Sequence, residues 1–374
     1  MKILFLCTFY HRALLFRQQM DALTERGHYV RAFNSAQYGE KIADKFVPIM
    51  DDKVVHIECW NKVDRALFFP RQWKIERELV KAYDLNSFDI IHAHLLLSSG
   101  YSALRMKRKY GIPYVVSVRV TDLTGFIRFP YFRKMAVEIL KEASGILFLS
   151  NSHKEELERR FLSRDEIKSI QGKCSIIGNC LEAFWTENRI ETSKSKPDNF
   201  HPLKVLTVAK IKPIKNITVA ADAVDELNRR GISARLTVVG ENQDQAELVR
   251  ITNHKCVDYI PFMKKEDLIE LYASQDIFLL PSINETFGRV YLEAMTQGLP
   301  VLYTIGQGFD GYFADGKVGY AIPSDNPLVI ADRIEDILKN YTKISESCIN
   351  NSALFDETVI MDRLEQFYKE SLNR

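Results

Sequence analysis

Several features that would place this 374-residue sequence in a membrane, secreted or zinc-binding class are missing. No run of about 18 consecutive apolar residues occurs, so we expect no membrane-spanning helix. The six cysteines are scattered without a CxxC pair or a zinc-like spacing to histidine, which favours a reducing cytoplasm and predicts no metal site. The opening MKILFLC is too short for a signal peptide, because His11 and Arg12 interrupt it, and it predicts a buried strand.

A nicotinamide-dependent dehydrogenase is also disfavoured. Its dinucleotide-binding fold needs a Gly-x-Gly-x-x-Gly turn after the first strand. Residues 8–11 of this chain read Thr-Phe-Tyr-His instead. Nicotinamide fluorescence retained through purification would revive that class.

Length and composition indicate a globular protein with two α/β domains. Cores of about 150 to 200 residues each account for the length, and 46% hydrophobic against 27% charged residues is ordinary for such a chain. Short apolar runs alternate with amphipathic stretches, which predicts parallel sheets because parallel strands need long crossovers. The predicted strands are Ile3–Cys7, Val54–Ile57, Asp89–His92, Tyr114–Val118, Gly145–Leu149, Lys204–Ala209, Ala234–Val239, Asp276–Leu280 and Pro300–Tyr303, and predicted helices include Ile217–Arg229 and Lys265–Ala273.

A polar segment divides the sequence. Residues 186–202 (TENRIETSKSKPDNFHP) contain two prolines and no apolar period, as a linker does. We therefore predict one domain over residues 1–185 and a second over residues 203–356. A terminal helix over about residues 357–374, with apolar residues at helical spacing, is expected to pack back on the first domain.

The two parts of the chain differ in charge. Residues 1–185 carry 29 Lys and Arg against 21 Asp and Glu, a net charge of +8, and the remainder carries 22 against 28. A positive domain can attract nucleic acid, an anionic membrane or a phosphorylated substrate. Because no recognised nucleic-acid-binding motif is present, we predict no nucleic-acid partner.

The stretch from Phe278 to Pro300 carries the most informative pattern. A buried strand ends at Pro281 and a helix begins near Gly288, so the loop between them lies at the edge where open α/β sheets bind ligands. Amides at the start of that helix can bind phosphate or sugar hydroxyls. Glu293 lies among apolar neighbours, and a ribose diol would supply the donors that it needs. The alternative is an exposed ion pair between Arg289 and Glu293.

Two lysines follow the first strand of the second domain. Lys210 lies at the strand tip and Lys215 just before a helix, where a cation opposes the helix dipole unless an anion lies between them. A diphosphate is such an anion. The alternative is that both are solvated surface lysines.

Together these residues match a known signature. Glu285 and Glu293, with seven residues between them and with Ala294, Gly298 and Pro300 following, resemble the EX7E motif of retaining GT-B glycosyltransferases of family four, written E-G-F-G-x-x-x-x-E-A-x-A-x-G-x-P. The resemblance covers nearly the whole chain and includes residues 89–94 (DIIHAH), 115–122 (VVSVRVTD), 176–182 (IIGNCLE), 237–240 (TVVG) and 306–322 (GQGFDGYFADGKVGYAI). It implies two Rossmann-like domains facing a central cleft, with the acceptor on the first and the donor on the second.

The resemblance also implies roles for individual residues. Glu293 is expected to bind the nucleotide ribose, and Glu285 the hydroxyls of the transferred sugar. Lys210 and Lys215 are expected to bind the donor diphosphate, and Arg119 occupies the position of a histidine near the donor sugar and phosphate. The remaining expected donor-binding residues are Thr286, Phe287, Gly288 and Gly240.

The expected reaction needs neither a metal nor another cofactor. The two lysines neutralise the leaving phosphate, a task that a divalent metal performs elsewhere, and the sequence has no Asp-x-Asp motif after a strand. In the front-face mechanism that the resemblance implies, the leaving phosphate helps to deprotonate the acceptor. Catalysis then depends on positioning and charge, without a covalent nucleophile.

Three departures from the family pattern motivate an alternative, a catalytically silent GT-B protein that binds a nucleotide sugar or a glycan. Residues 8–11 stand where the family often has paired glycines. Arg119 replaces the histidine and can bind phosphate but cannot act as a base. The alternative for Arg119 is a salt bridge with Asp122 or another carboxylate. Thr286 replaces a small residue. Because both glutamates and both lysines are in register, we favour the enzyme.

Two further features belong to the first domain. His92 and His94 alternate along one strand and face the same side of the sheet, and we expect them to pack locally without a catalytic role. Residues 126–134 (FIRFPYFRK) mix aromatic and basic side chains, as do residues 67–74, and a basic run follows at residues 105–109. Such a surface suits an anionic membrane, and the alternative is that the aromatic side chains pack in the core.

The sequence therefore predicts a cytoplasmic glycosyltransferase, peripheral on the inner membrane face, in envelope polysaccharide or glycolipid synthesis. Its donor is a nucleoside diphosphate sugar, with UDP as the expected nucleotide. Its acceptor is a glycan or a lipid-linked saccharide.

Overall fold

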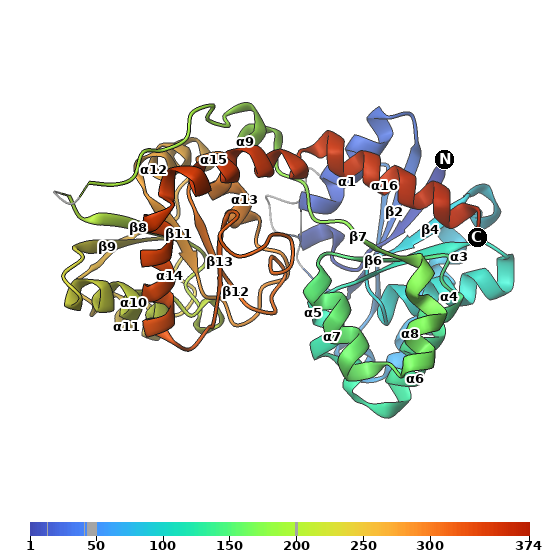
Figure 1. The fold of residues 1–374 in the computed structure, drawn as a ribbon. Helices are drawn as coiled ribbons and strands as arrows, with labels where there is room; N and C mark the ends of the chain where they lie inside the picture. The colour runs from blue at the N-terminus through green and yellow to red at the C-terminus, as the bar shows by residue number, and fades with distance from the viewer. Residues whose placement is uncertain (13, 41, 43–50, 199–200) are drawn as a thin grey trace. The chain divides into compact units, whose positions relative to one another are not determined.

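The computed structural model describes residues 1–12, 14–40, 42, 51–198 and 201–374. They form two compact units, each built on one parallel sheet (Figure 1). Unit 1 comprises Met1–Leu149, His153–Ile177 and Ile360–Arg374, and unit 2 comprises Ser150–Ser152 and Gly178–Val359. The predicted α/β class is confirmed.

Unit 1 contains a seven-stranded sheet in the order β3-β2-β1-β4-β5-β6-β7. Its strands are β1 (Lys2–Leu6), β2 (Tyr29–Gln37), β3 (Val54–Trp60), β4 (Ile90–Ala93), β5 (Tyr114–Val118), β6 (Gly145–Phe148) and β7 (Cys174–Ile176). Its helices are α1 (Leu14–Glu25), α2 (Lys62–Ala66), α3 (Phe68–Ala82), α4 (Ser98–Tyr110), α5 (Val120–Thr124), α6 (Pro130–Glu142), α7 (Asn151–Phe161), α8 (Arg164–Ile170) and most of α16 (Glu357–Leu372).

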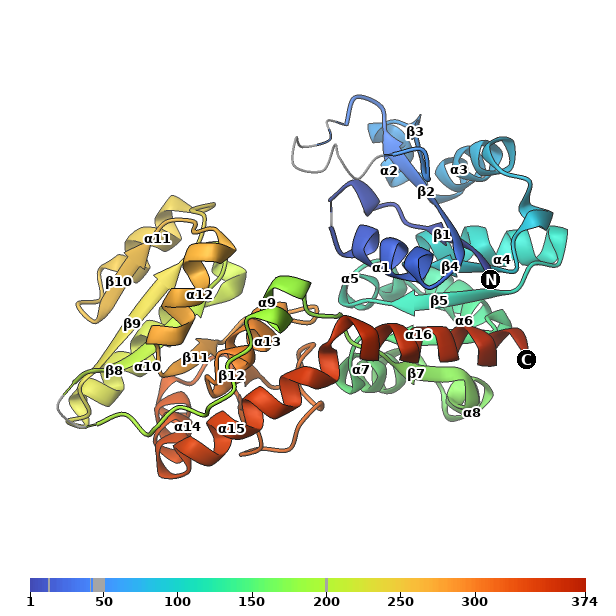
Figure 2. The same cartoon turned by 90° about the horizontal axis from the view of Figure 1, so that it is seen from above.

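Helices cover both faces of this sheet. On one face α3, α4 and α6 pack against one another and against β3, β4 and β5, over a core of aliphatic side chains. On the other face α1 and α16 lie side by side (Figures 1 and 2), and Arg26, just after α1, pairs with Asp362 of α16 at 2.6 Å. The terminal helix predicted from the apolar spacing is therefore present, and its residues from Ile360 onward belong to unit 1.

Unit 2 contains a six-stranded sheet in the order β10-β9-β8-β11-β12-β13. The strands are β8 (Leu203–Val208), β9 (Ala234–Val239), β10 (Val257–Ile260), β11 (Ile277–Leu280), β12 (Val301–Thr304) and β13 (Gly319–Ile322). The helices are α9 (Ala183–Glu187), α10 (Ile217–Arg229), α11 (Gln245–Thr252), α12 (Lys265–Ser274), α13 (Arg289–Thr296), α14 (Pro327–Lys339) and α15 (Tyr341–Ser352).

The division between the units differs from the predicted one. Unit 2 begins at Gly178, not after residue 185, because the following residues pack into it. The N–H of Leu181 donates to the Phe355 carbonyl at 2.9 Å, and Trp185 is 2% exposed against Tyr272.

Residues 186–198 are likewise part of unit 2 and do not join two domains. The N–H of Ile190 donates to the Thr296 carbonyl at 3.0 Å, and the N–H of Lys194 donates to Ser345 Oγ at 2.9 Å. Much of this attachment uses backbone groups, which need no apolar side chains. The polar composition of residues 186–198 therefore resembled that of a linker. Residues 199 and 200 of the predicted linker lie outside the described residues.

Candidate functional site

The sheet of unit 2 places two loops side by side. Strand β8 lies between β9 and β11, so the chain reverses its direction of strand addition between β8 and β11. Ligands of open α/β sheets bind at the carboxyl ends of the strands at such a point. The loop after β8 carries Lys210 and Lys215, and the loop after β11 carries Glu285 through Gly288.

Lys215 and Glu285 are in direct contact across this point. The Nζ atom of Lys215 lies 2.6 Å from Oε2 of Glu285, and their side chains are 22% and 13% exposed. Ser282 Oγ donates to the same carboxylate oxygen at 3.4 Å. One cation and one anion are thereby held together at the rim of the sheet.

Backbone and amide contacts fix the two loops to each other. The N–H of Ile283 donates to the Ile214 carbonyl at 2.9 Å, and Asn216 Nδ2 donates to the Pro281 carbonyl at 3.3 Å. Asn216 has φ 57°, which places it in the left-handed region that asparagine tolerates better than most residues. Sequence reasoning missed Asn216, although an asparagine directly before a helix was a usable signal.

Glu285 is also positioned through its backbone. Its N–H donates to Gln307 Oε1 at 2.9 Å, and its carbonyl accepts the N–H of Gly308 at 3.0 Å. A Cβ on Gly308 would lie 2.0 Å from the Thr286 carbonyl oxygen, so this close approach requires glycine. Gln307 was not singled out from the sequence, although it lies in the 306–322 stretch.

Lys210 has a different environment from Lys215. Its Nζ lies 3.7 Å from Glu241 Oε2, and both side chains are 54% exposed. Such a pair contributes little to stability. Lys210 is therefore held loosely beside the more firmly positioned Lys215.

Close packing after β9 requires glycine at Gly240. A Cβ at this position would lie 1.8 Å from the Ala209 carbonyl oxygen. The carbonyl of Gly240 accepts the Tyr259 hydroxyl at 2.9 Å. The chain leaving β9 therefore runs close to the residue that precedes Lys210.

The first turn of α13 has no side-chain cap. Gly288 is the N-cap residue with φ 80°, and it provides no side-chain hydrogen bond to the first turn. Its left-handed conformation requires glycine, and so does its packing, because a Cβ there would lie 2.3 Å from the Tyr291 ring. Phe287 is 2% exposed among Phe309, Tyr312 and Phe355, so it can offer a ligand only its backbone.

Glu293 is a half-buried carboxyl on α13. Burial raises its pKa to about 7, and the Arg289 charge opposes this shift. The Tyr272 hydroxyl is 3.5 Å from Oε2 of Glu293. The ion pair formed by Arg289 is with Glu182, at 2.5 Å, and not the alternative Arg289–Glu293 pair. Glu293 thus retains acceptor capacity for hydroxyl donors from a ligand.

Arg119 is held in unit 1 as the N-cap residue of α5. Its Nε donates to the His94 carbonyl at 3.1 Å, and its guanidinium lies 5.2 Å from the centre of the Phe16 ring. Asp122 Oδ2 accepts the backbone N–H of Arg119 at 3.0 Å. Within the described residues the guanidinium forms no salt bridge, so the alternative pairing with Asp122 is not the arrangement observed. Burial lowers the Arg119 pKa.

His92 in β4 and His94 just after this strand pack locally. His92 bonds to Tyr368 of α16 at 2.7 Å and to Ser117 at 2.8 Å, and its ring stacks on His94 at 4.0 Å. Burial lowers the His92 pKa to about 3. A neutral histidine bridging a strand and a helix is a packing element.

Unit 1 also contains a large cavity at the carboxyl edge of its sheet. Its volume is about 710 Å³, within the range of small-molecule sites. The loops after β1, β4 and β5 contribute to it, and Phe9, Trp60 and Phe68 provide aromatic walls. This is the same edge of the sheet from which Arg119 begins α5.

The described residues contain neither a group of side chains placed to bind a metal nor a helix that could span a membrane. No three histidine, cysteine, aspartate or glutamate side chains in that part of the chain are grouped as metal ligands. Among the same residues, no helix has both the length and the apolar character to cross a bilayer.

Comparison with known proteins covers both units. A family model described as "Glycosyl transferases group 1" matches residues 188–355, and one described as "Glycosyltransferase Family 4" matches residues 15–171. An alpha-monoglucosyldiacylglycerol synthase of Acholeplasma laidlawii is 24% identical over 299 residues, covering 75% of this chain and 74% of that protein.

Two further comparisons extend over more of the chain. An N-acetyl-alpha-D-glucosaminyl L-malate synthase of Bacillus anthracis is 20% identical over 324 residues, covering 85% of this chain and 82% of that protein. The crystal structure of Anabaena Alr3699/HepE in complex with UDP superposes with a TM-score of 0.73 at 16% identity, covering 99% of this chain and 100% of that chain. The fold likeness confirms the predicted GT-B architecture.

Proposed function

Because the chain belongs to the group 1 glycosyltransferases of family 4, and is therefore a sugar-transferring enzyme, we propose that it uses a UDP-sugar as donor and retains the anomeric configuration. The acceptor is a hydroxyl group of a glycan or a lipid-linked saccharide. The observation that carries the proposal is the Lys215–Glu285 contact at the switch point of unit 2.

Each donor group has a candidate partner in unit 2. Lys210 and Lys215 bind the diphosphate, together with the amides at the start of α13. Glu293 accepts hydrogen bonds from the ribose, and Glu285 with the backbone of Phe287 and Gly288 binds the transferred sugar. When the diphosphate occupies the site, the Lys215 ammonium is shared between it and Glu285.

The chemical step follows from these positions. The bond between the anomeric carbon and the phosphate oxygen breaks, and the acceptor oxygen bonds to that carbon on the same face. The acceptor proton passes to the departing phosphate oxygen. Lys210 and Lys215 stabilise the charge that develops on the phosphate, and Arg119 is the candidate in unit 1 for a further phosphate contact.

We propose that this charge stabilisation makes the reaction independent of a metal. EDTA should leave the rate unchanged. A strict requirement for added Mg²⁺ or Mn²⁺ would contradict this part of the proposal.

The activity test is release of the nucleoside diphosphate from UDP-glucose, UDP-galactose and UDP-N-acetylglucosamine, with and without glycan acceptors. Acceptor-dependent release, with an α-linked product from an α-linked donor, supports retaining transfer. Donor binding without release or transfer supports the silent alternative, and a β-linked product contradicts retention.

We also propose a cytoplasmic location with reversible docking on the inner membrane, in the synthesis of envelope polysaccharide or glycolipid. The relative from Acholeplasma laidlawii is named for a glycolipid. Phe129 and Tyr131 are 55% and 60% exposed. The Tyr131 ring lies 5.7 Å from the Phe69 ring, so the two aromatic–basic stretches, residues 126–134 and 67–74, are in contact. Basic side chains beside an anionic surface contribute about 1 kcal/mol each.

Part of the predicted membrane surface is core instead. Ile127 is 1% exposed, and Phe132 packs edge-on against Phe68 at 5.1 Å. Arg133 Nε donates to the Phe161 carbonyl at 2.6 Å. The side chain of Phe126 lies outside the described part.

The docking test therefore changes exposed residues only. A variant with Phe129→Ser, Tyr131→Ser, Arg128→Glu and Lys134→Glu should lose co-sedimentation with anionic liposomes at low salt. A control with Arg128→Lys and Lys134→Arg should retain it. Failure of the wild type to bind these liposomes would contradict docking without affecting the transferase assignment.

A further inference from the structure

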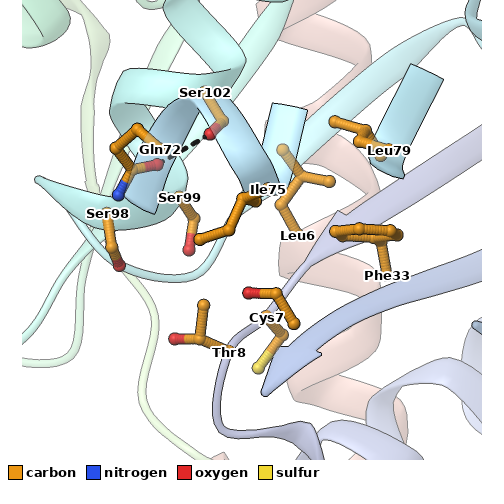
Figure 3. A pocket seen from close by; sticks show the side chains of 11 residues that line it. Leu6, Cys7, Thr8, Phe33, Gln72, Ile75, Leu79, Ser98, Ser99 and Ser102 are labelled. Carbon is orange, nitrogen blue, oxygen red and sulfur yellow. Dashed lines mark hydrogen bonds between the residues drawn. The ribbon is translucent and has the colours of Figure 1, made fainter. Parts of the chain in front are cut away.

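A small recess in unit 1 lies between the helices α3 and α4 and the ends of β1 and β2 (Figure 3). Leu6, Phe33 and Ile75 give it apolar walls, and Gln72, Ser98 and Ser99 lie together on one side of it in the view. Its volume is about 10 Å³, enough for the centre of about one water-sized group.

Several polar atoms around this recess have no hydrogen-bond partner among the described residues. Gln72 Nε2, Ser98 Oγ, Ser99 Oγ and Ser35 Oγ are all buried atoms without a hydrogen bond. Gln72 and Ser99 are 1% and 4% exposed. The other end of the Gln72 amide is fixed, because Ser102 Oγ donates to Oε1 at 3.0 Å, and this leaves Nε2 as a donor.

Such a cluster can bind a small polar group. A buried polar atom without a partner is destabilising, and native proteins rarely leave several at one place. The unpaired atoms here are three neutral hydroxyl oxygens, which can donate and accept, and one amide nitrogen, which can only donate. A neutral hydroxyl group matches them, whereas a carboxylate or phosphate would be buried against Leu6 and Phe33 without a cation in the recess.

The recess adjoins the large cavity described above. The two share Thr8, Ile75 and Ser98 as lining residues. Trp60, on the wall of the large cavity, has a buried Nε1 that forms no hydrogen bond with the described residues. The large cavity has space for a sugar ring, and the recess has space for one substituent of that ring.

We propose that this cavity binds a pyranose of the acceptor, with one hydroxyl of the ring in the recess and the ring beside Trp60. The inference rests on the proposed transferase function and specifies the chemistry of its acceptor. Gln72, Ser98 and Ser99 are then specificity-determining residues, because a site that hydrogen-bonds a substrate hydroxyl strongly disfavours an analogue that lacks it.

The test is binding of methyl α-glucoside, methyl α-galactoside and methyl α-mannoside to the full chain, measured by ligand-detected NMR. At least one of these neutral glycosides should bind. Ser99→Ala and Gln72→Leu should each weaken the neutral glycoside about tenfold or more. Ser169→Ala, an exposed serine on α8, is the matched control.

Thermal unfolding separates this role from a structural one. Ser99→Ala removes an unpaired hydroxyl, so its midpoint should equal or exceed that of the wild type while glycoside affinity falls. If Gln72→Leu does not fold, Ser99→Ala alone decides. Affinity within twofold of wild type for Ser99→Ala would contradict the proposal and leave the recess to a resident water. No binding of any of these glycosides would also contradict it.

A parallel titration with UDP keeps the two proposals distinguishable. Loss of glycoside binding with UDP affinity unchanged places the effect in the acceptor cavity. UDP binding and donor turnover without any glycoside binding contradict only the cavity assignment. Glycoside binding without donor binding or turnover contradicts only the proposed transferase chemistry.

Discussion

The ammonium group of Lys215 lies 2.6 Å from a carboxylate oxygen of Glu285, although the two residues are 70 positions apart in the sequence. One follows β8 and the other follows β11, the strands between which the sheet of unit 2 changes its order. Sequence reasoning assigned both residues to the donor but gave them separate partners. Their contact shows that each positions the other before any ligand arrives.

Lys215 and Glu285 should be energetically coupled. Lys215→Met or Glu285→Gln alone leaves one partly buried charge without its partner, whereas the double variant removes both charges. We expect the double variant to be more stable than the sum of the single effects implies, by about 1 to 3 kcal/mol. Calorimetric unfolding of the four proteins measures this, and additive effects would show that the contact is not formed in solution.

Lys210 should act on the ligand and not on the fold. Its side chain is 54% exposed, so Lys210→Ala should change stability by no more than about 0.5 kcal/mol. Loss of a charged hydrogen bond should weaken UDP-sugar binding by about 1.5 to 3 kcal/mol. Lys212→Ala, an exposed lysine of the same loop, is the control. Equal losses in both variants would indicate a general charge effect in place of a diphosphate contact.

Glu293 should make donor binding depend on pH. Because burial raises the pKa of Glu293 to about 7, the free protein holds a proton there at lower pH, whereas the proposed ribose contact needs the charged carboxylate. Affinity should therefore increase as pH rises through about 7, with proton release on binding. UDP-glucose is the suitable ligand, because its phosphate diester does not titrate in this range.

Calorimetric titration at pH 6 and pH 8 measures this dependence. Glu293→Gln should remove it, and Glu285→Gln should retain it. If affinity depends on pH equally in the wild type and in Glu293→Gln, Glu293 does not contact the ribose.

Tyr368 should hold α16 on unit 1 through His92. Tyr368→Phe keeps the ring but leaves a buried imidazole nitrogen without its partner, so we expect a loss of about 1 to 3 kcal/mol. UDP affinity should not change, since both residues are in unit 1. Tyr38→Phe, at a tyrosine that is 57% exposed, is the control. An unchanged unfolding midpoint for Tyr368→Phe would contradict a stabilising role.

The regular parts of the fold could be predicted from apolar runs. The strands Tyr114–Val118 and Ala234–Val239 and the helix Ile217–Arg229 have the predicted bounds. Strand β2 was missed because its centre holds Asn34 and Ser35, which are buried polar residues. Asn34 is satisfied by His11 and His56, and such long-range partners cannot be recognised from local sequence.

The short strands were missed for a different reason. Strands β7, β10 and β13 have three or four residues and include half-buried side chains, so they lack a clear apolar run. The domain boundary was placed too late because the backbone attaches residues 186–198 to unit 2. Backbone contacts leave little trace in the side-chain pattern.

The residues of the candidate site could be proposed from residue type and spacing. Both glutamates, both lysines and the glycine at the start of α13 could be named from the sequence. The supporting residues Asn216 and Gln307 could not, because their contacts depend on how two loops meet. The partnership of Arg289 with Glu182 likewise depends on α9, which the apolar pattern did not predict.

Ligand-dependent thermal stability tests the central claim most directly. Wild type is compared with the triple variant Lys210→Ala, Lys215→Met and Glu293→Gln across UDP, GDP, ADP and their glucose conjugates. At a concentration 100 times its dissociation constant, the correct donor should stabilise the wild type by about 2.7 kcal/mol and the triple variant by far less. A wild type that responds to none of these ligands, or a triple variant that responds equally, would contradict a nucleotide-sugar site at the β8 and β11 loops.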